Sequence, residues 1–399
     1  MLDEKRIAGT HLAPYLRNVD VQWNHVNTTD LPEMDFSAED RERFSLRSGD
    51  LLVCEGGEVG RTALWDGRLS ECYFQKAIHR LRPLTENDEP RFFRYFMQLA
   101  VHSGIFALST ASTIQHLPAE KLRVVRYPSP PRSQQRAIAD YLDRETARLD
   151  ALVVAKERVL GLLAEKRRAL ITRAVTRGLD PSAPLRDPGI PWLGEIPAHW
   201  AALPFKYGFA QIGSGTTPPT GSAEYYDGDM PWVTTSELRE NVVLTTTQCL
   251  TRVALEDLSS LRVYPVGSVL FAMYGATIGR VALLGIEATV NQAVCVLAEP
   301  TRFAARFVFY ALQASREHLI VLASGGGQPN LNAEKLRDHR LACPPLSEQR
   351  AIIAYTERET GKLDALRSAT EGTIALLKER RAALVAAAVT GQIDAGTTA

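Results

Sequence analysis

The sequence predicts an α+β protein in which two similar mixed α/β domains are separated by two long helices. The main observation is an internal repeat. Residues 130–180 and 344–394 align at a constant offset of 214 without a gap, and 27 of the 51 aligned positions are identical. A second observation is that the segments preceding these two stretches repeat each other at lower identity. The chain is therefore two homologous halves, each ending in the same long helix.

Apolar residues spaced three and four apart predict that each repeated stretch is a helix with one stripe turned toward a partner. In the first copy they are Ile138, Leu142, Leu149, Leu152, Val159, Leu163 and Leu170. In the second copy they are Ile352, Leu363, Leu366, Leu377 and Leu384. Ser133 and Ser347 are expected as N-caps, and Gly178 and Gly391 as left-handed C-terminal stops. Each helix then spans roughly 44 residues, or about 65 Å.

Charged residues on this stripe favour helices that other surfaces partly cover. Glu145 and Lys156 lie on the first stripe, and surface residues such as Asp150 and Arg167 are copied in the second helix. A uniform two-stranded zipper would keep the stripe apolar. The alternatives are two ordinary amphipathic helices of a bundle, or a paired spacer that also docks a partner; the copied surface residues favour the spacer.

Composition points to a globular intracellular chain. It has 399 residues and no net charge, and it lacks both an apolar run of membrane-spanning length and a secretory signal. Its five cysteines form no CxxC pair, so neither a disulfide framework nor a structural zinc site is indicated. We expect a cytoplasmic protein. Zero net charge argues against a nucleic-acid binder that works alone, although residues 130–180 hold 11 Lys and Arg against 7 Asp and Glu.

Taken in order, residues 1–129 are the first mixed α/β domain, in which short apolar segments alternate with turn signals. A helix with an aromatic stripe, from about Arg91 to Leu108, is read as core. The first long helix (130–180) is followed by a Pro-rich extended linker (181–200). The other predicted segments are a second domain at 201–343, the second long helix at 344–394 and a tail at 395–399.

Several motifs of the second domain match the first. Gly56 to Arg61 corresponds to Tyr274 to Arg280, and Gln75-Lys76-Ala77 corresponds to Asn291-Gln292-Ala293. The repeat predicts two similar backbone frames that carry different surfaces on a shared spacer.

The chain resembles the specificity subunits of type I restriction–modification enzymes. The resemblance lies in PPLSEQRAIIAYTERETGKLDAL, in the GIPWLGEIPAHW linker, in residues 274–280 and in SGGGQPNLNAEKL. It implies that each domain recognises one half of a split double-stranded DNA site. It also implies that the two helices pair as an antiparallel coiled coil, set the spacing between the domains and bind two methyltransferase subunits. Restriction subunits would complete the nuclease–translocase.

Residue types that contact bases and phosphates give the candidate DNA-binding positions. In the first domain they are Tyr15, Arg17, Asn18, Arg61, Gln75, Lys76, Gln115 and His116. In the second they are Lys206, Thr216, Thr217, Tyr225, Tyr226, Thr234, Ser236, Arg239, Tyr274, Thr277, Arg280, Gln328 and Asn330. For each one the plainer alternative is a turn residue or a surface polar group. Arg61 and Arg280 share a place in the repeat, which favours phosphate contact or a role in the frame over base choice.

No catalytic activity is predicted for the chain itself. It contains neither the Asn/Asp-Pro-Pro-Tyr/Phe motif of an amino-methyltransferase nor a GxxxxGK[ST] phosphate loop, and its histidines form no HExxH. We expect no cofactor and no metal, with the chemistry residing in partner subunits. Two other classes remain open: a coiled-coil scaffold that binds only protein, and a free-standing DNA-modifying enzyme.

The first domain is expected to be short at its beginning. Pro14-Tyr15-Leu16 aligns with Pro231-Trp232-Val233, so residues 189–217 of the second domain have no counterpart in the first. Members of the resembled family usually carry this opening on both domains. We expect either a start upstream of Met1 or a first domain without the apolar strand that residues 201–212 supply to the second.

Overall fold

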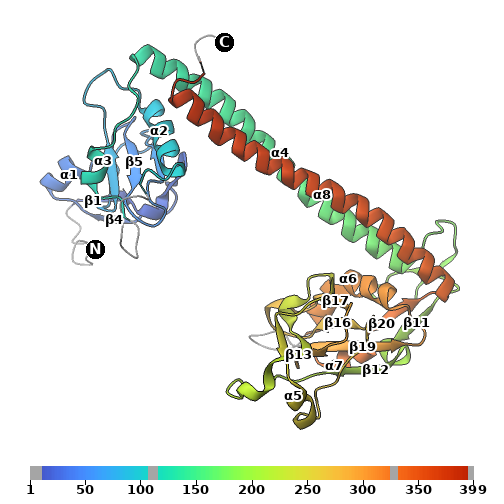
Figure 1. Ribbon diagram of the computed structural model, residues 1–399. Helices are drawn as coiled ribbons and strands as arrows, with labels where there is room; N and C mark the ends of the chain where they lie inside the picture. The colour runs from blue at the N-terminus through green and yellow to red at the C-terminus, as the bar shows by residue number, and fades with distance from the viewer. Residues whose placement is uncertain (1–10, 107–115, 324–330, 394–399) are drawn as a thin grey trace. The chain divides into compact units, whose positions relative to one another are not determined.

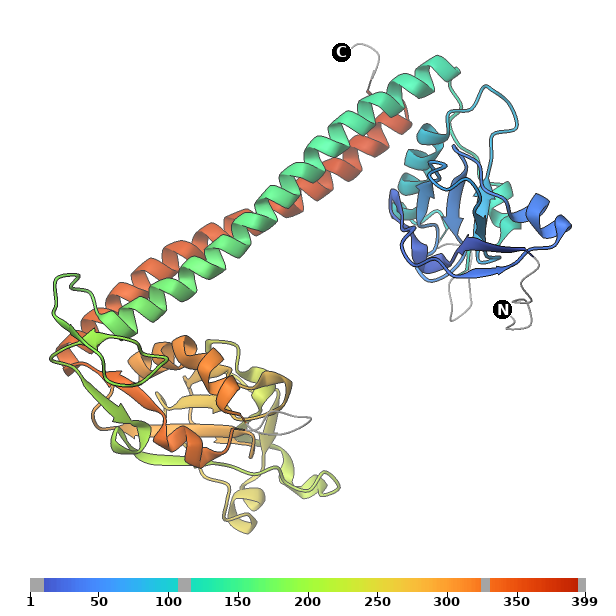
Figure 2. The same ribbon diagram turned by 180° about the vertical axis from the view of Figure 1, so that it is seen from behind.

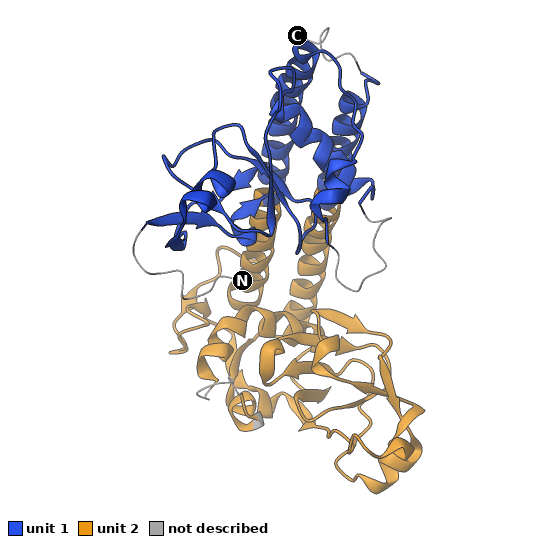
Figure 3. Cartoon of the chain, turned by 90° about the vertical axis from the view of Figure 1, so that its left-hand side faces the viewer, with its two compact units in different colours: residues 1–157, 371–399 blue, residues 158–370 orange. Residues whose placement is uncertain are grey.

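The structure, a computed structural model, describes residues 11–106, 116–323 and 331–393. The chain divides into two compact units, residues 1–157 with 371–399 and residues 158–370 (Figure 3). Below they are called unit 1 and unit 2. Each unit contains one mixed α/β domain and part of both long helices. Among the described residues, no helix combines the length and apolarity needed to cross a membrane.

The two long helices are α4 (Arg132–Arg177) and α8 (Leu346–Val389). The N-terminal part of α4 accompanies the C-terminal part of α8 in unit 1, and the converse holds in unit 2. These parts lie side by side in both views (Figures 1 and 2). In unit 1 Arg381 Nε lies 2.9 Å from Asp150 Oδ1, and in unit 2 Arg167 Nε lies 3.6 Å from Asp364 Oδ1. The paired segments therefore run antiparallel, as the resemblance implied, and the copied Asp150 and Arg167 hold them together.

The helix ends differ in part from the sequence expectation. Gly178 and Gly391 have φ values of +71° and +74° and terminate the helices in the left-handed region, as predicted. The serine caps are wrong, because α4 and α8 begin one residue before Ser133 and Ser347. The carbonyls of Pro131 and Pro345 accept the first helical bonds instead.

The apolar stripe of the helices is only partly buried. Near the domains it is covered, and Ile138, Leu142 and Ile352 are at most 4% exposed. Farther along the helices, Leu152 is 43% exposed in unit 1 and Leu366 is 56% exposed in unit 2. The heptad spacing thus identified the helices, but it did not predict burial, since Leu149 and Leu363 on the same stripe are each only 6% exposed.

In unit 1 two small sheets and three helices form the domain. The sheet orders are β4-β1-β7 and β6-β5-β8, and β2 pairs with β3. The elements are β1 (Leu12–Leu16), β2 (Val21–Gln22), β3 (His25–Val26), β4 (Glu33–Asp35), α1 (Ala38–Phe44), β5 (Leu51–Cys54), β6 (Thr62–Leu64), β7 (Tyr73–Phe74), β8 (Ile78–Leu81), α2 (Pro90–His102) and α3 (Ala119–Arg123). The aromatic stripe of α2 is core as predicted, since Phe92, Tyr95 and Phe96 are buried.

Unit 2 repeats these sheets with additional strands. The orders are β15-β13-β18 and β12-β19-β16-β17-β14, with the pairs β11-β20 and β10-β9. The elements are β9 (Leu185–Arg186), β10 (Ile196–Pro197), β11 (Ala201–Pro204), β12 (Phe209–Ser214), β13 (Tyr226–Val233), β14 (Asn241–Val243), β15 (Gln248–Leu250), α5 (Arg252–Asp257), β16 (Val269–Ala272), β17 (Val281–Leu284), β18 (Thr289–Val290), β19 (Val294–Pro300), α6 (Ala305–Leu322), α7 (Ala333–Asp338) and β20 (Arg340–Cys343).

Backbone hydrogen bonds repeat between the units more closely than the side chains do. Gln75 N–H donates to Leu16 O at 3.0 Å, and Asn291 N–H donates to Val233 O at 3.0 Å. Leu117 N–H bonds to Glu55 O at 2.8 Å, as Leu331 N–H does to Met273 O at 2.9 Å. The same backbone frame is therefore built twice.

Residues 181–214 depart from the sequence expectation. The linker is more than an extended connector, because it contains the β9–β10 pair and buries Leu193, Ile196 and Trp200 in the core of unit 2. The predicted apolar strand at 201–212 is two strands, β11 and β12, separated by a short 3-10 turn at Phe205–Tyr207. β11 pairs with β20 and β12 with β19, so this stretch completes the second domain.

Candidate nucleic-acid interface

In unit 1, polar side chains gather where the parallel strands β1 and β7 end. The register places Tyr15 beside Tyr73 and Leu16 beside Phe74. Arg17-Asn18 and Gln75-Lys76 follow directly, and they share one edge because parallel strands end at the same side of a sheet. Lys76 is exposed and Gln75 is half-buried. This edge, with the loop described next, is called polar edge 1.

A Gly-rich loop between β5 and β6 completes polar edge 1. Asn18 Nδ2 donates to Gly56 O at 2.8 Å, and Arg61 Nη2 donates to Asn18 O at 2.8 Å. Among the described residues, Asn18 Oδ1 and Arg61 Nε are buried without a hydrogen-bond partner. His116 is exposed beside the loop, where a Cβ on Gly56 would lie 3.4 Å from its Nδ1. Four predicted residues from separate segments, Asn18, Arg61, Gln75 and His116, thus meet here.

In both units an acidic residue fixes the turn that follows the central strand. In unit 1 the Arg17 N–H donates to Asp20 Oδ2 at 2.8 Å, and the Arg17 guanidinium also binds this carboxylate. The hydrogen bonds to Asp20 raise the pKa of Arg17, which therefore stays charged. In unit 2 the Thr234 N–H donates to Glu237 Oε2 at 2.7 Å. Sequence reasoning missed Asp20 and Glu237, although the alignment of PYLRNVD with PWVTTSE places them opposite each other.

Polar edge 2 lies at the equivalent place in unit 2, where β13 and β18 run parallel. Thr234 Oγ1 and Ser236 Oγ are 2.7 Å apart just after β13. Thr217 Oγ1 hydrogen bonds to Gln292, which follows β18 together with Asn291. Trp232 Nε1–H donates to Thr216 O at 3.2 Å and so ties the segment at 216–217 to β13. Asn291 and Gln292 were not chosen from the sequence, although their alignment with Gln75-Lys76 marked them.

Arg239 and Arg280 extend polar edge 2. β14 and β17 run parallel, and Asn241 is paired with Ala282. Arg239 precedes Asn241 by two residues and Arg280 precedes Ala282 by two residues, so the two arginines enter the paired strands at the same level. Arg239 Nε donates to Ser236 O at 3.1 Å. The side chain of Arg280 is half-buried and makes no hydrogen bond or ion pair within the described chain. The nearby Thr277 is half-buried, and burial raises the pKa of Tyr274, which stays a protonated hydroxyl donor.

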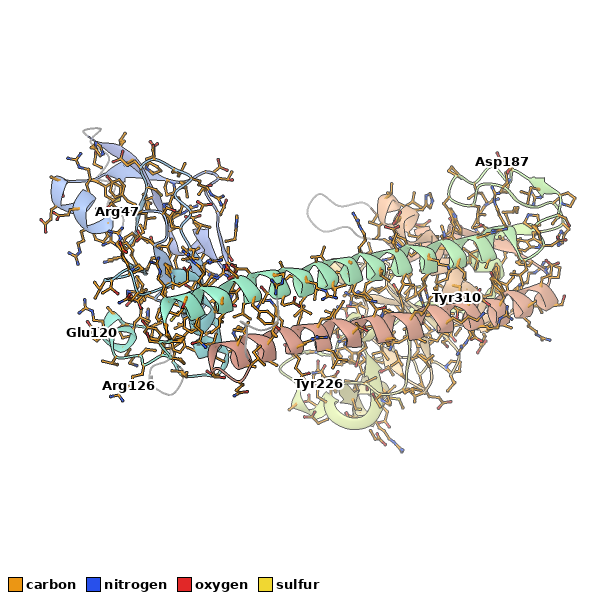
Figure 4. The ribbon with its side chains drawn as sticks, turned by 90° about the horizontal axis from the view of Figure 1, so that it is seen from above. Arg47, Glu120, Arg126, Asp187, Tyr226 and Tyr310 are labelled. Atoms are coloured by element: carbon orange, nitrogen blue, oxygen red, sulfur yellow. The ribbon has the colours of Figure 1, made fainter. Side chains whose placement is uncertain are left out.

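Other predicted residues lie elsewhere. Tyr15 is 3% exposed and packs edge-on against Phe36, which favours a core role. Lys206 pairs with Asp338 at 2.7 Å, beside α7. Tyr225 and Tyr226 lie next to α5, where the Tyr225 hydroxyl is 3.3 Å from Asp257 Oδ2 and the Tyr226 hydroxyl donates to Pro218 O at 2.7 Å; Figure 4 labels Tyr226 in unit 2. Gln115, Gln328 and Asn330 lie outside the described residues.

Neither polar edge contains the donor set of a metal centre. No group of three or more His, Cys, Asp or Glu side chains that could hold a metal ion occurs in residues 11–106, 116–323 and 331–393. The groups present include hydroxyls, amides, arginines, a lysine and a histidine, beside one structural carboxylate in each unit. Such groups recognise the edges of bases and the oxygens of phosphates.

Comparisons with known proteins agree with a duplicated DNA-recognition frame. The family model for the type I restriction modification DNA specificity domain matches residues 18–156 and again residues 207–364. Over 329 residues the chain is 25% identical to a Methanocaldococcus jannaschii protein assigned as the MjaX specificity subunit of a type I restriction enzyme, covering 80% of this chain and 73% of that protein. The chain belongs to the type I restriction–modification DNA specificity family and carries its domain twice.

Solved structures share the fold. A chain from a structure of complex assembly and conformational transition in a type I restriction–modification system superposes with a TM-score of 0.78 at 16% identity, covering 96% of this chain and 92% of that one. The HsdS subunit from Thermoanaerobacter tengcongensis gives a TM-score of 0.55 at 17% identity, with 96% and 91% covered.

Proposed function

We propose that each unit reads one half of a bipartite double-stranded DNA site through its polar edge, and that this chain thereby gives a type I restriction–modification complex its sequence specificity. The observation that carries the proposal is that one backbone frame is built twice, with different side chains at the same edge. Where unit 1 has Arg17-Asn18 and Gln75-Lys76, unit 2 has Thr234-Thr235 and Asn291-Gln292. A common frame with different polar groups suits recognition of two different half-sites.

The bonding of some of these side chains distinguishes a phosphate contact from a base contact, and Arg280 is the clearest case. It has no partner within the described chain and lies beside Arg239, so a phosphate would supply its missing acceptor. Thr234, Ser236, Asn291 and Gln292 are neutral groups that both donate and accept, as base edges require.

The long helices are proposed to set the spacing of the two half-sites and to dock two methyltransferase subunits. Support comes from large apolar side chains left exposed on the helices. They are Leu152, Val154 and Leu376 in unit 1 and Val159, Leu162 and Leu366 in unit 2, all between 40% and 66% exposed. Exposed apolar rows are typical of surfaces that another protein covers. We assign methylation, translocation and cleavage to partner subunits, including restriction subunits, and place the complex in the cytoplasm.

The test is reconstitution with purified methyltransferase subunits, followed by selection from a random-sequence DNA library at physiological salt. The chain alone should bind DNA weakly and without selectivity, because it has no net charge and phosphate contacts dominate affinity. The complex should select one bipartite sequence. Tight, selective binding by the chain alone would contradict this division of labour. Absence of selectivity in the complex would favour the protein-binding scaffold instead.

A further inference from the structure

We infer that Arg316 of α6 is a positioning residue for DNA contact by unit 2. It holds the two turns that carry Arg239 and Arg280, one through an ion pair with Glu240 and the other by packing on Gly279. The inference rests on the proposed reading of DNA by polar edge 2, and it adds a residue that acts through the two arginines.

The first turn, residues 239–241, contains a residue with an unfavourable backbone conformation. Glu240 has a φ of +59°, in the left-handed region that non-glycine residues rarely adopt. Its N–H donates to Val281 O at 2.9 Å, which ties the turn to β17. Such a conformation persists only where surrounding contacts hold it. Because Arg239 directly precedes Glu240, relaxation of this backbone would move the arginine at polar edge 2.

Arg316 supplies a side-chain contact to the first turn. Its Nη1 lies 3.5 Å from Glu240 Oε1, and the two side chains are 37% and 38% exposed. An ion pair this exposed contributes little to the stability of the whole unit. Its consequence is local, because it favours the arrangement of the turn in which the carboxylate faces α6.

The stem of the same arginine lies against the second turn, residues 277–280. A Cβ on Gly279 would lie 2.8 Å from Arg316 Cγ, so the absence of a Cβ lets the arginine stem lie against this turn. Gly279 has a φ of +77°, and its N–H donates to Ala272 O at 2.9 Å. The next residue is Arg280. One side chain of α6 therefore contacts both turns that present arginines at polar edge 2.

Unit 1 contains an equivalent contact made by different residues. Asn24 has the same φ of +59°, and its N–H donates to Thr62 O at 3.1 Å, as Glu240 N–H does to Val281 O. Gln98 of α2 is 4% exposed, and its Nε2 donates to Asn24 Oδ1 at 2.5 Å. In both units a helix side chain therefore holds the left-handed residue.

The packing of the helix on a glycine is repeated as well. A Cβ on Gly60 would lie 2.5 Å from Val101 Cγ2. Residues 91–101 and 306–316 share the pattern Arg-Phe-x-x-Tyr-x-x-Gln and align at an offset of 215, which places Val101 opposite Arg316. The close approach to the glycine is thus common to both units, whereas the charge at this helix position belongs to unit 2. We attribute this charge to the ion pair with the left-handed residue.

The test reverses the charges of the ion pair in the full chain, assembled with purified methyltransferase subunits. Binding is measured on the DNA duplex that the wild-type complex selects. Glu240→Arg and Arg316→Glu should each weaken binding about fivefold, and the double variant should return to within about twofold of wild type. A positive charge added at residue 240 would by itself tighten DNA binding. The sign of the Glu240→Arg effect therefore separates positioning from simple charge.

Two controls show whether the effect passes through the arginines. In a chain that carries both Arg239→Ala and Arg280→Ala, Glu240→Arg should no longer weaken binding, because the positioned side chains are gone. Glu287→Arg makes the same charge change at an exposed position between β17 and β18 and should not weaken binding.

Hydrogen exchange of the free chain gives a readout that does not depend on DNA. Glu240→Arg should speed exchange about threefold at residues 239–241 and 279–281, where the two turns lose their contact with α6. Exchange at residues 294–300 of β19 should stay unchanged, which would show that the domain remains folded.

The failure of this inference is distinguishable from failure of the proposed function. Equal or tighter DNA binding by a selective complex after Glu240→Arg would overturn the inference alone. A double variant as weak as the single variants would do the same. A wild-type complex that selects no DNA sequence would overturn both the inference and the proposed function.

Discussion

Single residues show how one frame can serve different purposes in its two copies. Arg61 and Arg280 occupy the same place in the repeat, but Arg61 donates to Asn18 O and lies 3.6 Å from Glu58, with its side chain 14% exposed. Arg280 has neither kind of contact within the described residues. This bonding favours the frame for Arg61, one of the two roles that the sequence left open, and we propose phosphate contact for Arg280.

This difference predicts opposite effects for two equivalent substitutions. Arg61→Ala should lower the stability of unit 1 by about 1–3 kcal/mol, because it leaves a carbonyl in the frame without its donor. Arg280→Ala should leave stability unchanged and weaken DNA binding by the reconstituted complex by about tenfold, with a smaller dependence on salt. Denaturation curves and binding isotherms at several salt concentrations measure both. Equal losses of stability in the two variants would mean that Arg280 also belongs to the frame.

The sequence identified polar residues near the ends of the repeated strands but could not tell which are accessible. Tyr15 has the chemistry of a base-contacting aromatic, yet its side chain packs in the core with Phe36. Asn291 and Gln292 were not selected from the sequence, although they lie beside Thr217 and Thr234. Side chains alternate between the two faces of a strand, so a register shift of one residue exchanges the buried and the accessible positions.

At the scale of elements, a buried glutamine joins each long helix to the domain before it. Gln349 is fully buried; its Oε1 accepts from Ala304 N–H at 2.7 Å, and its Nε2 donates to Arg302 O and Pro344 O at 3.0 and 2.9 Å. Gln135 does the same for Glu89 N–H, Asn87 O and Pro130 O. This shared junction is one physical reason why the helix beginnings have kept the same residues.

Replacing these glutamines should destabilise each unit separately. Gln349→Leu leaves three backbone groups unpaired in unit 2 and should cost about 2–4 kcal/mol there, and Gln135→Leu should do the same in unit 1. Hydrogen exchange resolved by unit is the measurement, because a single unfolding midpoint is ill-defined for two units. Arg350→Leu, at an exposed neighbouring position, is the control and should change neither unit. A loss spread evenly over both units after Gln349→Leu would contradict a local junction.

The elements themselves were largely predictable. The heptad spacing found both long helices, and glycine marked their ends, because these signals are local. The serine caps were wrong because the carbonyls of Pro131 and Pro345 accept the first helical bonds instead. The buried glutamines bond to the adjacent Pro130 and Pro344 and so join this turn to the domain packed against each helix, and this packing depends on long-range contacts. The pairing of β11 and β12 with distant strands likewise depends on long-range contacts that the Pro-rich sequence does not reveal.

At the scale of the whole molecule, fold and hydrogen bonding repeat between the units, and we propose that each unit reads DNA separately and that the long helices space them. Each unit has its own core, and no residue of polar edge 1 belongs to unit 2. Substitutions within one domain should therefore alter only one half of the recognised DNA sequence. Changes in helix length should alter only the number of base pairs between the two halves.

We predict that exchanging residues 201–342 for the corresponding domain of another family member will change one half-site and leave the other half-site and the gap intact.

Inserting residues into both long helices should instead lengthen the gap, because each helical residue adds about 1.5 Å and each base pair about 3.4 Å. A heptad insertion keeps the apolar stripe in phase and would add about three base pairs. Methylation mapped across the genome of cells expressing each chimera with its methyltransferase subunits measures both outcomes. As a control, the single substitution Arg280→Ala in the original chain should weaken methylation without changing the sequence recognised. A domain exchange that altered both half-sites together would show that the two polar edges do not read DNA independently.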